Sequence, residues 1–219
     1  MTTPDAPQIL TPQLVLQAYS IGYFPMADHR DAEGVGWVRP EERGTLPVDG
    51  LHIPRSLRRA VRRAPFEVRT DTAFASVMQA CAAARPGREE TWINQDILSV
   101  YAALHRHGFA HSVEAWADGA LVGGLYGVSI GAAFFGESMF SVRTDASKIC
   151  LVHLAARLRA GGYVLHDTQF VTDHLARFGA RPLSAAAYER QLAEALAEEG
   201  DFNALKDADP DTVLALASG

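Results

Sequence analysis

A glutamate inside an apolar run is the first residue of this sequence whose chemistry needs an explanation. Glu137 lies in the stretch FFGESMFS, between the phenylalanines 134 and 135 and the pair Met139 and Phe140. Burying an ionised carboxylate without a partner is costly, so such a residue has a partner, an altered pKa or a role in chemistry. Glu137 is therefore the first candidate site residue.

Asp167 and Gln169, in the stretch VLHDTQF, form the second candidate group. Residues two apart on a strand point to the same face, so the two side chains can act together. An aspartate that accepts a hydrogen bond from the glutamine amide would leave the amide oxygen to accept an N–H or O–H from a substrate. Two polar residues at a solvated strand end are the structural alternative, so the pair becomes informative only beside Glu137.

The elements that must position these residues follow from apolar spacing, caps and turn residues. Helices are expected at residues 13–21, 54–64, 73–84, 95–107 with Asn94 as N-cap, 145–160 and 172–178, and residues 23–50 are expected to be loop-rich. Strands are expected at residues 111–117, 121–130, 132–141 and 163–171, with turns at 118–119 and 130–131. Antiparallel strands followed by helix, strand and helix predict an α+β fold.

The chain divides by composition into three expected regions. A small N-terminal helical and loop region covers 1–65, a main domain that carries the candidate site residues covers 66–195, and an acidic tail over 196–219 is expected to be partly disordered. Seven carboxylates and one lysine between Glu194 and Asp211 account for the whole formal charge of −6. The remainder is neutral, so net charge does not exclude a polyanionic partner.

Cysteine usage and hydropathy indicate a reduced compartment. Cys81 and Cys150 are far apart and outside any C-x-x-C spacing, which fits a cytosolic protein better than a disulfide scaffold or a zinc site. The N-terminus shows no signal-peptide pattern, and the uncharged run 120–136 is short for a membrane span. We therefore expect a cytoplasmic protein without a membrane partner.

Several longer stretches resemble one known family, the leucyl/phenylalanyl-tRNA–protein transferases. The resemblance covers about residues 11–192 and rests on YSIGYFPM (19–26), LHIPRS (51–56), TWI (91–93), HSVEAW (111–116), LVGGLYG (121–127), GESMFS (136–141), DASK (145–148), DTQ (167–169) and DH (173–174). It implies a fold like that of the acyl-CoA N-acyltransferases (GNAT-like), with a mixed antiparallel sheet flanked by helices.

The resemblance also implies an activity and its partners. The activity is transfer of Leu, Phe and, less efficiently, Met from aminoacyl-tRNA to proteins that begin with Arg or Lys, which marks them for degradation by the N-degron route. Because the ester on the tRNA is already activated, no cofactor and no metal are expected. A monomer that binds no DNA is expected. The family's catalytic residues fall on Asp167, Gln169 and Glu137, with Gln169 positioning the attacking amine and Glu137 holding a cationic amine.

Further site residues are expected around these three. The aminoacyl pocket is assigned to Leu125, Phe134, Met139, Phe140 and Ser141, although apolar residues of this kind are more often core. Trp92 is expected to stack on the terminal adenine of the tRNA, and Met26 stands where family members often carry a second tryptophan. A stripe of arginines on one helix face, Arg55, Arg58, Arg59, Arg62 and Arg63, is expected to contact tRNA phosphates, the alternative being a solvated face.

Rival functions remain open on the sequence alone. An acyl-CoA acetyltransferase would need a glycine-containing phosphate turn before the helix at 145, where the chain reads FSVRTD without glycine. A peptidoglycan-bridge transferase would hold two copies of the domain, and a catalytically silent tRNA-binding module would not need the three polar residues. His105, His107 and His111 form an H-x-H-x3-H pattern, but a shared metal is not expected because a helix end separates them.

Overall fold

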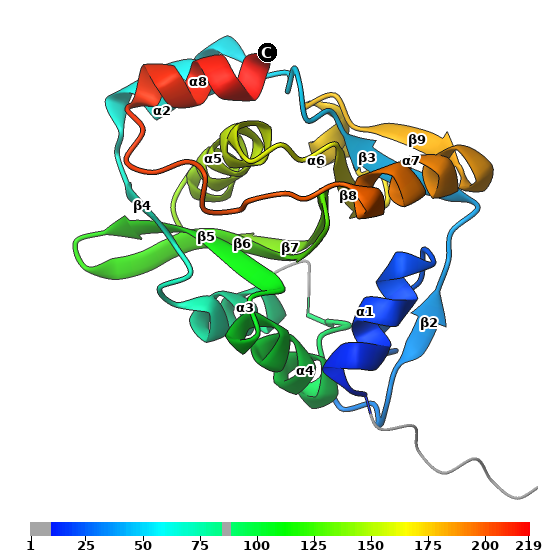
Figure 1. Ribbon diagram of the computed structural model, residues 1–219. Helices are drawn as coiled ribbons and strands as arrows, with labels where there is room; N and C mark the ends of the chain where they lie inside the picture. The colour runs from blue at the N-terminus through cyan, green and yellow to red at the C-terminus, as the bar shows by residue number, and fades with distance from the viewer. Residues whose placement is uncertain (1–9, 85–88) are drawn as a thin grey trace, which may run out of the picture.

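A mixed sheet with helices on both faces forms the body of the molecule (Figure 1). The computed structural model describes residues 10–84 and 89–219. The mixed sheet has seven strands in the order β4-β5-β6-β7-β8-β3-β9, and β1 and β2 form a separate two-stranded sheet. The α+β prediction with a mixed sheet flanked by helices is therefore confirmed.

The strands and helices have the following bounds. The strands are β1 (Phe24–Met26), β2 (Gly36–Val38), β3 (Glu42–Leu46), β4 (Glu67–Thr70), β5 (Ala110–Ala117), β6 (Ala120–Ile130), β7 (Ala133–Ser141), β8 (Leu165–Gln169) and β9 (Arg181–Ser184). The helices are α1 (Pro12–Ser20), α2 (Arg55–Arg63), α3 (Phe74–Ala82), α4 (Gln95–Arg106), α5 (Ala146–Ala160), α6 (Asp173–Ala176), α7 (Ala185–Ala197) and α8 (Pro210–Ser218).

The single parallel pair in this sheet, β7 with β8, positions the candidate residues. Parallel pairing runs from Ala133 opposite Leu165 to Phe135 opposite Asp167, and α5 connects the two strands. All other pairings in the sheet are antiparallel. The second half of β7 and the end of β8 thus continue without pairing to each other, and Glu137 and Gln169 both lie in these continuations.

Two apolar clusters cover the two faces of the sheet. Helix α5, with α2 and α8 behind it, packs on one face, and α3, α4, α1 and α7 cover the other, as Figure 1 shows. Alternating residues of the central strands supply the two clusters, for example Leu125 to the α5 side and Tyr126 to the opposite side. The candidate residues at the centre of the sheet therefore lie between two cores.

Most of the expected elements are confirmed with small shifts at their ends. Asn94 caps α4 as predicted, since its side chain accepts from the Ile97 N–H at 3.0 Å. Asp118 and Gly119 form the β5–β6 turn with φ of 53° and 75°, the left-handed geometry that tight hairpins require. Among the described residues, no helix has both the length and the apolarity to cross a membrane.

The segment 23–50 is loop-rich as expected, but it also contains three short strands that were not predicted. That segment contains β1, β2 and β3, and β3 pairs with β8 on one side and β9 on the other. A boundary at residue 65 therefore does not separate the N-terminal region from the main sheet. The strands were not apparent from sequence because they are short and their polar residues, such as Glu42 and Arg43, show no clear alternation.

The expectation of a partly disordered acidic tail is wrong. Pro210 begins α8, and Asp209 caps it by accepting from the N–H groups of Asp211 and Thr212. Val213, Leu214 and Ala217 are buried in the cluster under α5. The acidic composition hid a short amphipathic helix whose apolar face docks on the body of the protein.

Candidate active site

A cavity of about 290 Å³ opens where β7 and β8 cease to pair. Its lining includes Glu137, Gln169, Leu125, Met139, Trp92 and Met26 from the predicted site residues. On the α5 side it adds Leu46, Gly136, Leu151, Leu154, His166, Thr168, Thr172, His174 and Leu175, and on the opposite side Phe24, Tyr126, Ser138 and Phe170. The cavity therefore passes between the two strands and reaches both apolar clusters.

A bulge in β7 explains the position of Glu137. Opposite β6, Tyr126 pairs with Ser138 and Gly127 pairs with Gly136, so Glu137 is the extra residue without a partner across the ladder. Bulges re-aim a side chain at the point where pairing is interrupted. The carboxylate is thereby directed into the cavity from an otherwise apolar strand.

The Glu137 carboxylate accepts hydrogen bonds from three side chains. Tyr19 Oη donates to Oε1 at 2.5 Å, and Gln169 Nε2 donates to the same oxygen at 2.9 Å. Tyr101 Oη lies 3.4 Å from Oε2 and 2.5 Å from Tyr19 Oη. Because the second oxygen has only the long contact with Tyr101, it retains capacity to accept from a substrate.

Burial sets the protonation of this group. The pKa of Glu137 is raised from 4.5 to about 7: burial raises it most, the hydrogen bond from Tyr19 opposes the rise, and the negative charge of Asp167 adds to it. Burial, and then the charge of Glu137, raise the pKa values of Tyr19 and Tyr101 well above the usual 10. The two phenols therefore keep their protons near neutral pH, while Glu137 can exchange one.

Gln169 ends β8 in a left-handed conformation, with φ of 58°. Its main-chain N–H donates to Asp167 Oδ1 at 2.7 Å, and its side-chain amide donates to Glu137. The expected aspartate–amide bond between the two side chains is therefore wrong: Asp167 holds the backbone of Gln169, and Glu137 orients its amide. Simple strand alternation fails here because of the positive φ.

A close backbone contact supports this conformation. Gly44 of β3 pairs with Gln169 at an irregular point in the register. A Cβ at position 44 would lie 2.5 Å from the carbonyl carbon of Phe170, closer than real contacts allow. Glycine at 44 thus permits the turn that follows Gln169.

Asp167 is completely buried and does not line the cavity. Arg43 donates to it from Nε to Oδ1 at 2.9 Å and from Nη2 to Oδ2 at 2.7 Å, and Tyr188 Oη donates to Oδ2 at 2.6 Å. With the Gln169 N–H, these donors occupy both oxygens. Asp167 is therefore a positioning residue, which acts on the site through Gln169.

Arg43 is almost as buried as its partner. Its exposed fraction is 1%, Nη1 donates to the carbonyl of Gly22 at 3.0 Å, and the guanidinium lies 4.6 Å from the ring centre of Phe24 and 4.8 Å from that of Tyr188. Burial opposes its charge, but the Asp167 charge and hydrogen bonds raise the pKa of Arg43 above its usual value. The pair is thus an ionised, fully hydrogen-bonded unit.

Sequence reasoning assigned no role to four side chains of this network. Tyr19 stood in the YSIGYFPM stretch and could have been noticed there. Tyr101 and Tyr188 lie on the apolar faces of α4 and α7, where they look like core residues. Arg43 gave no signal, because it was expected in a loop.

The predicted aminoacyl pocket is only partly assembled. Leu125 and Met139 line the cavity, joined by Leu151 and Leu154 of α5. The bulge also puts Phe134 and Met139, five residues apart, into the same apolar cluster. Phe134 nevertheless lies outside the cavity, because its ring stacks on Phe202 with centroids 5.8 Å apart.

Two other pocket predictions do not line the cavity either. Phe140 is buried in the cluster on the opposite side of the sheet from α5. The Ser141 hydroxyl donates to the Arg143 carbonyl at 2.8 Å and accepts from the Ser147 N–H at 3.3 Å. These contacts connect Ser141 to the start of α5. Phe134, Phe140 and Ser141 therefore lie behind the cavity wall and do not form it.

Trp92 and Met26 meet on the side of the cavity away from α5. Met26 ends β1, and the Ala27 N–H donates to the Trp92 carbonyl at 3.3 Å, which ties the two segments together. The two side chains expected to receive the terminal adenine are therefore neighbours on one cavity wall.

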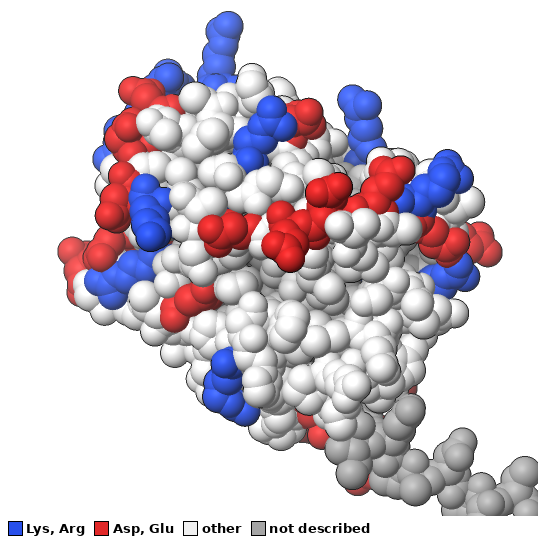
Figure 2. All heavy atoms as spheres, viewed as in Figure 1, with Lys and Arg blue, Asp and Glu red and all other residues white. Residues whose placement is uncertain are grey.

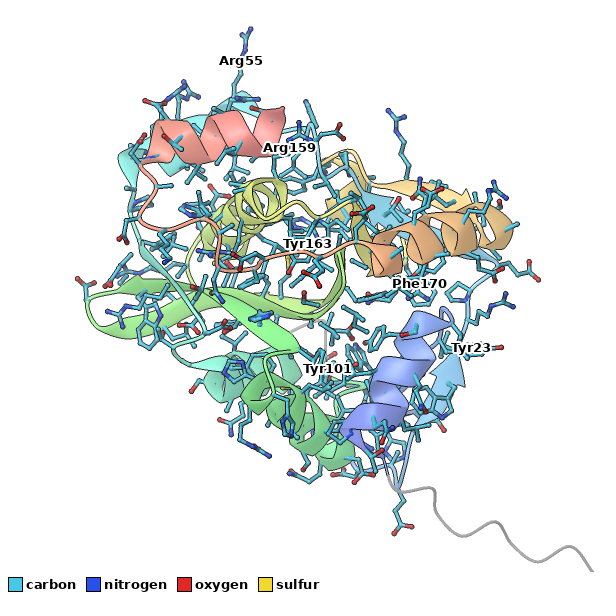
Figure 3. The ribbon with its side chains drawn as sticks, viewed as in Figure 1. Tyr23, Arg55, Tyr101, Arg159, Tyr163 and Phe170 are labelled. Atoms are coloured by element: carbon cyan, nitrogen blue, oxygen red, sulfur yellow. The ribbon has the colours of Figure 1, made fainter. Side chains whose placement is uncertain are left out.

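The arginines of α2 do not line the cavity. Arg58 donates to the Ile53 carbonyl and to Ser218 Oγ, and Arg62 forms an ion pair with Asp211 at 2.8 Å, so α8 occupies part of the stripe. Arg55, Arg59 and Arg63 are exposed, and Figure 3 shows Arg55 projecting outward from α2. These three arginines form the accessible basic face of the helix.

The histidine pattern forms no metal site in the part of the chain that the structure describes. Among residues 10–84 and 89–219, no group of three or more His, Cys, Asp or Glu side chains could hold an ion. His111 Nδ1 lies 2.8 Å from Asp71 Oδ2, and His105 Nδ1 lies 2.8 Å from the Ala110 carbonyl. Both rings therefore serve local structure.

Comparison with known proteins matches two consecutive segments of the chain to one family. The model described as "Leucyl/phenylalanyl-tRNA protein transferase" matches residues 45–193, and that of the corresponding N-terminal domain matches residues 9–41.

Curated relatives with the name leucyl/phenylalanyl-tRNA--protein transferase are similar over most of their length. The relative from Paramagnetospirillum magneticum is 58% identical over 194 residues, which are 89% of this chain and 93% of that protein. The one from Maricaulis maris is 56% identical over 88% of this chain and 89% of its own. The one from Caulobacter vibrioides is 57% identical over 87% and 88%.

Proposed function

Because this chain belongs to the leucyl/phenylalanyl-tRNA protein transferase family, we propose that its central cavity is the site of aminoacyl transfer. The protein is an aminoacyltransferase that moves an amino acid from aminoacyl-tRNA to proteins. The transferred residues are Leu and Phe and, less efficiently, Met. The acceptors begin with Arg or Lys, which places the enzyme in the N-degron route.

The reaction is the aminolysis of an ester. The acceptor's α-amino nitrogen bonds to the carbonyl carbon of the aminoacyl group, the bond from that carbon to the ribose oxygen breaks, and the ribose leaves as a hydroxyl. An α-amino group with a pKa of about 7.7–8.0 is largely protonated at neutral pH, so a proton must leave before attack. No cofactor and no metal are needed, because the ester is already activated.

The hydrogen bond between Gln169 Nε2 and Glu137 is the observation that carries this proposal. Because the carboxylate takes the amide N–H, the Gln169 oxygen is directed toward a donor, and the acceptor's amine provides one. Glu137, with a pKa near 7, can hold the incoming ammonium ion and accept its proton. Gln169 then positions the neutral amine. The proton that this amine loses as it bonds to the carbonyl carbon reaches the leaving ribose oxygen directly or through water, and Glu137 releases the first proton to solvent.

The two sides of the cavity fit the two ends of the aminoacyl-adenosine. Leu125, Met139, Leu151 and Leu154 form an apolar wall of the kind that encloses Leu or Phe. On the other side Trp92 can stack on the terminal adenine, with the thioether of Met26 against it. Glu137 and Gln169 lie between them, where the ester carbon would be.

Charge on the surface supports one orientation of the tRNA. Arg55, Arg59 and Arg63 offer an accessible basic face for phosphates. Figure 2 shows acidic side chains in a band over α7 and the segment that joins it to α8, where the sequence carries Glu194, Glu198, Glu199, Asp201 and Asp207. A tRNA would therefore approach by the arginines and avoid this band.

The fold and setting complete the proposal. A mixed sheet whose parallel pair, β7 and β8, stops pairing at the cavity fits the GNAT-like fold that the sequence resemblance implies. We infer a monomeric cytoplasmic enzyme whose nucleic-acid partner is tRNA and not DNA, with no membrane partner.

A transfer assay tests the proposed function. Labelled Phe-tRNA or Leu-tRNA is incubated with peptides that begin with Arg, Lys or Asp, and incorporation of label into the peptide is measured with and without prior RNase treatment. Label should enter the Arg and Lys peptides only and should be abolished by RNase. Transfer from acetyl-CoA instead, or tRNA binding without transfer, would overturn the proposal in favour of an acetyltransferase or a silent binding module.

A further inference from the structure

Two histidines on the α5 side of the cavity have no part in the chemistry described above. His166 lies on β8 with an exposed fraction of 1%, and His174 lies on α6. Both line the cavity together with Leu46, Leu151, Leu154 and Leu175. A pocket meant only for an aliphatic or phenyl group would be expected to have apolar residues at these positions.

Each imidazole has a buried nitrogen without a hydrogen-bond partner among the described residues. These atoms are Nδ1 of His166 and Nε2 of His174. Apolar rings meet both imidazoles edge-on, Phe134 at 5.9 Å from His166 and Phe178 at 5.3 Å from His174, and these rings offer no hydrogen-bond partner. Buried polar atoms are nearly always paired, so two orphans in one cavity indicate a partner that arrives with the substrate.

The protonation of the rings suits such a partner. Burial lowers the pKa of His166 to about 4, and burial together with the charges of Lys148 and Arg177 lowers the pKa of His174. A neutral imidazole offers one donor and one acceptor nitrogen. The two tautomers of the ring exchange these roles, so the nitrogen beside the pocket can act as donor or as acceptor.

The position of His166 brings its ring to the pocket wall. A Cβ built on Gly136, the residue before Glu137, would lie 3.6 Å from His166 Nε2. Glycine at 136 thus leaves open the space beside this nitrogen, on the α5 side of the residues that hold the ester. A side chain that extends from the ester toward α5 passes this edge of the ring.

We propose that His166, with His174 beside it, reads a hydrogen-bonding atom at the far end of the transferred side chain, so that this chain transfers tyrosyl as well as leucyl and phenylalanyl groups. The inference rests on the proposed function, since it concerns the donor pocket of the same site. Tyrosine departs least from phenylalanine, as it adds one hydroxyl that can donate to or accept from an imidazole. A purely apolar pocket rejects an added hydroxyl by about 100-fold, and one that pairs the hydroxyl does not.

The test compares three side chains on one tRNA. Phenylalanyl, 4-fluorophenylalanyl and tyrosyl groups are charged onto the same tRNA, and kcat/KM for transfer to an Arg-initiated peptide is measured. The fluorine tests the added size without a hydroxyl donor. The wild-type protein should transfer the tyrosyl group within about tenfold of phenylalanyl and better than the fluorinated analogue.

Variants assign the effect to the imidazole. His166→Leu should lower tyrosyl transfer by about tenfold or more relative to phenylalanyl, and His166→Asn, which keeps polar atoms, should recover part of it. His153→Leu is the matched control, because His153 is also largely buried with a pKa lowered to about 4 but lines a different cavity. It should leave the tyrosyl-to-phenylalanyl ratio unchanged.

Phenylalanyl transfer in the same samples separates this inference from the proposed function. If the wild-type protein transfers no aminoacyl group, the proposed function fails and the inference with it. If phenylalanyl transfer proceeds and the tyrosyl-to-phenylalanyl ratio is the same in His166→Leu as in the wild type, the inference alone is overturned. Should His166→Leu lose all transfer, the ratio in His166→Asn decides: a ratio reduced only partly supports the inference, and one equal to wild type overturns it.

Discussion

The titration of Glu137 links the bulged strand to the chemistry. A carboxyl group with a pKa near 7 is present in both forms at neutral pH, so it can take a proton from an ammonium ion and release it again. The raised pKa of Glu137 also makes the free energy of unfolding depend on pH. The folded state holds this proton at pH values where the unfolded chain has lost it, so the contribution is fully present below about pH 4.5 and is lost as pH rises through 7.

Glu137→Gln should therefore become more stable relative to the wild type as pH rises. The amide does not titrate, and between pH 5 and pH 8 we expect the difference in free energy of unfolding to move in its favour by roughly 2 kcal/mol. Urea unfolding at both pH values measures this. A constant difference for Glu137→Gln would mean that the carboxyl group titrates normally.

Arg43 gives a second prediction, because it neutralises a buried charge. Arg43→Met leaves Asp167 buried and unpaired, which should lower the free energy of unfolding by about 3–5 kcal/mol. Arg43→Lys keeps the charge but not the bidentate contact, so its loss in free energy of unfolding should be smaller. It should lower kcat by a larger factor than it changes the KM for tRNA, because the backbone of Gln169 is no longer held in place. Denaturant unfolding and steady-state kinetics measure both.

The control for Arg43 is an exposed ion pair. Arg69 pairs with Glu67 at the surface, where water screens the charges, so Arg69→Met should lower the free energy of unfolding far less than Arg43→Met. Equal losses at both positions would contradict the view that Arg43 holds the site.

At the level of single residues, the sequence identified the polar side chains of the site but not the hydrogen bonds between them. Glu137 and Gln169 were recognised from residue type and resemblance, and both line the cavity. That Glu137 and not Asp167 orients the amide depends on a bulge and on a positive φ, neither of which a sequence pattern reveals. Tyr19 and Arg43 reach the site from segments more than 100 residues away in the chain.

Among the elements, the approach of β3 to the end of β8 is the contact on which the site depends most. Gly44 allows the backbone after Gln169 to turn against β3, and the same strand carries Arg43 to Asp167. Sequence reasoning placed this segment in a loop. It missed the strand because β3 is five residues long and gains its stability from two neighbours, not from its own pattern.

Gly44→Ala should damage both fold and activity. A methyl group there would meet backbone atoms of Phe170 at 2.5 Å, which no side-chain rotation relieves. We expect a loss of about 1–3 kcal/mol in the free energy of unfolding, and a fall in kcat because Gln169 shifts with the strand. Gly36→Ala is the matched control, since its Cβ would have its nearest neighbour at 3.6 Å. Wild-type kinetics in Gly44→Ala would show that this contact does not position Gln169.

In the whole molecule, the C-terminal segment completes the core behind α5. Helix α8 packs on α5 and α2, and its Asp211 pairs with Arg62 (Figure 1). The α+β class and most helices followed from periodicity, because long regular patterns predict elements well. The docking of α8 did not, since the helix begins inside a strongly acidic stretch that resembles a disordered tail.

Leu214→Ala tests whether this segment is part of the folded body. Leu214 is 2% exposed, so the cavity left behind should lower the free energy of unfolding by about 2–4 kcal/mol. Leu216→Ala, on the half-buried side of the same helix, should cost less. Both values come from urea unfolding curves. No loss in either variant would indicate that α8 is detached in solution.

The central claim is that the Gln169 amide, oriented by Glu137, positions the attacking amine. The most direct test is the single-turnover rate of peptide-bond formation by Gln169→Ala with saturating Phe-tRNA and an Arg-initiated peptide. We predict a fall of about 100-fold with tRNA binding unchanged, because only the geometry of attack is lost. A rate within twofold of wild type would contradict the account.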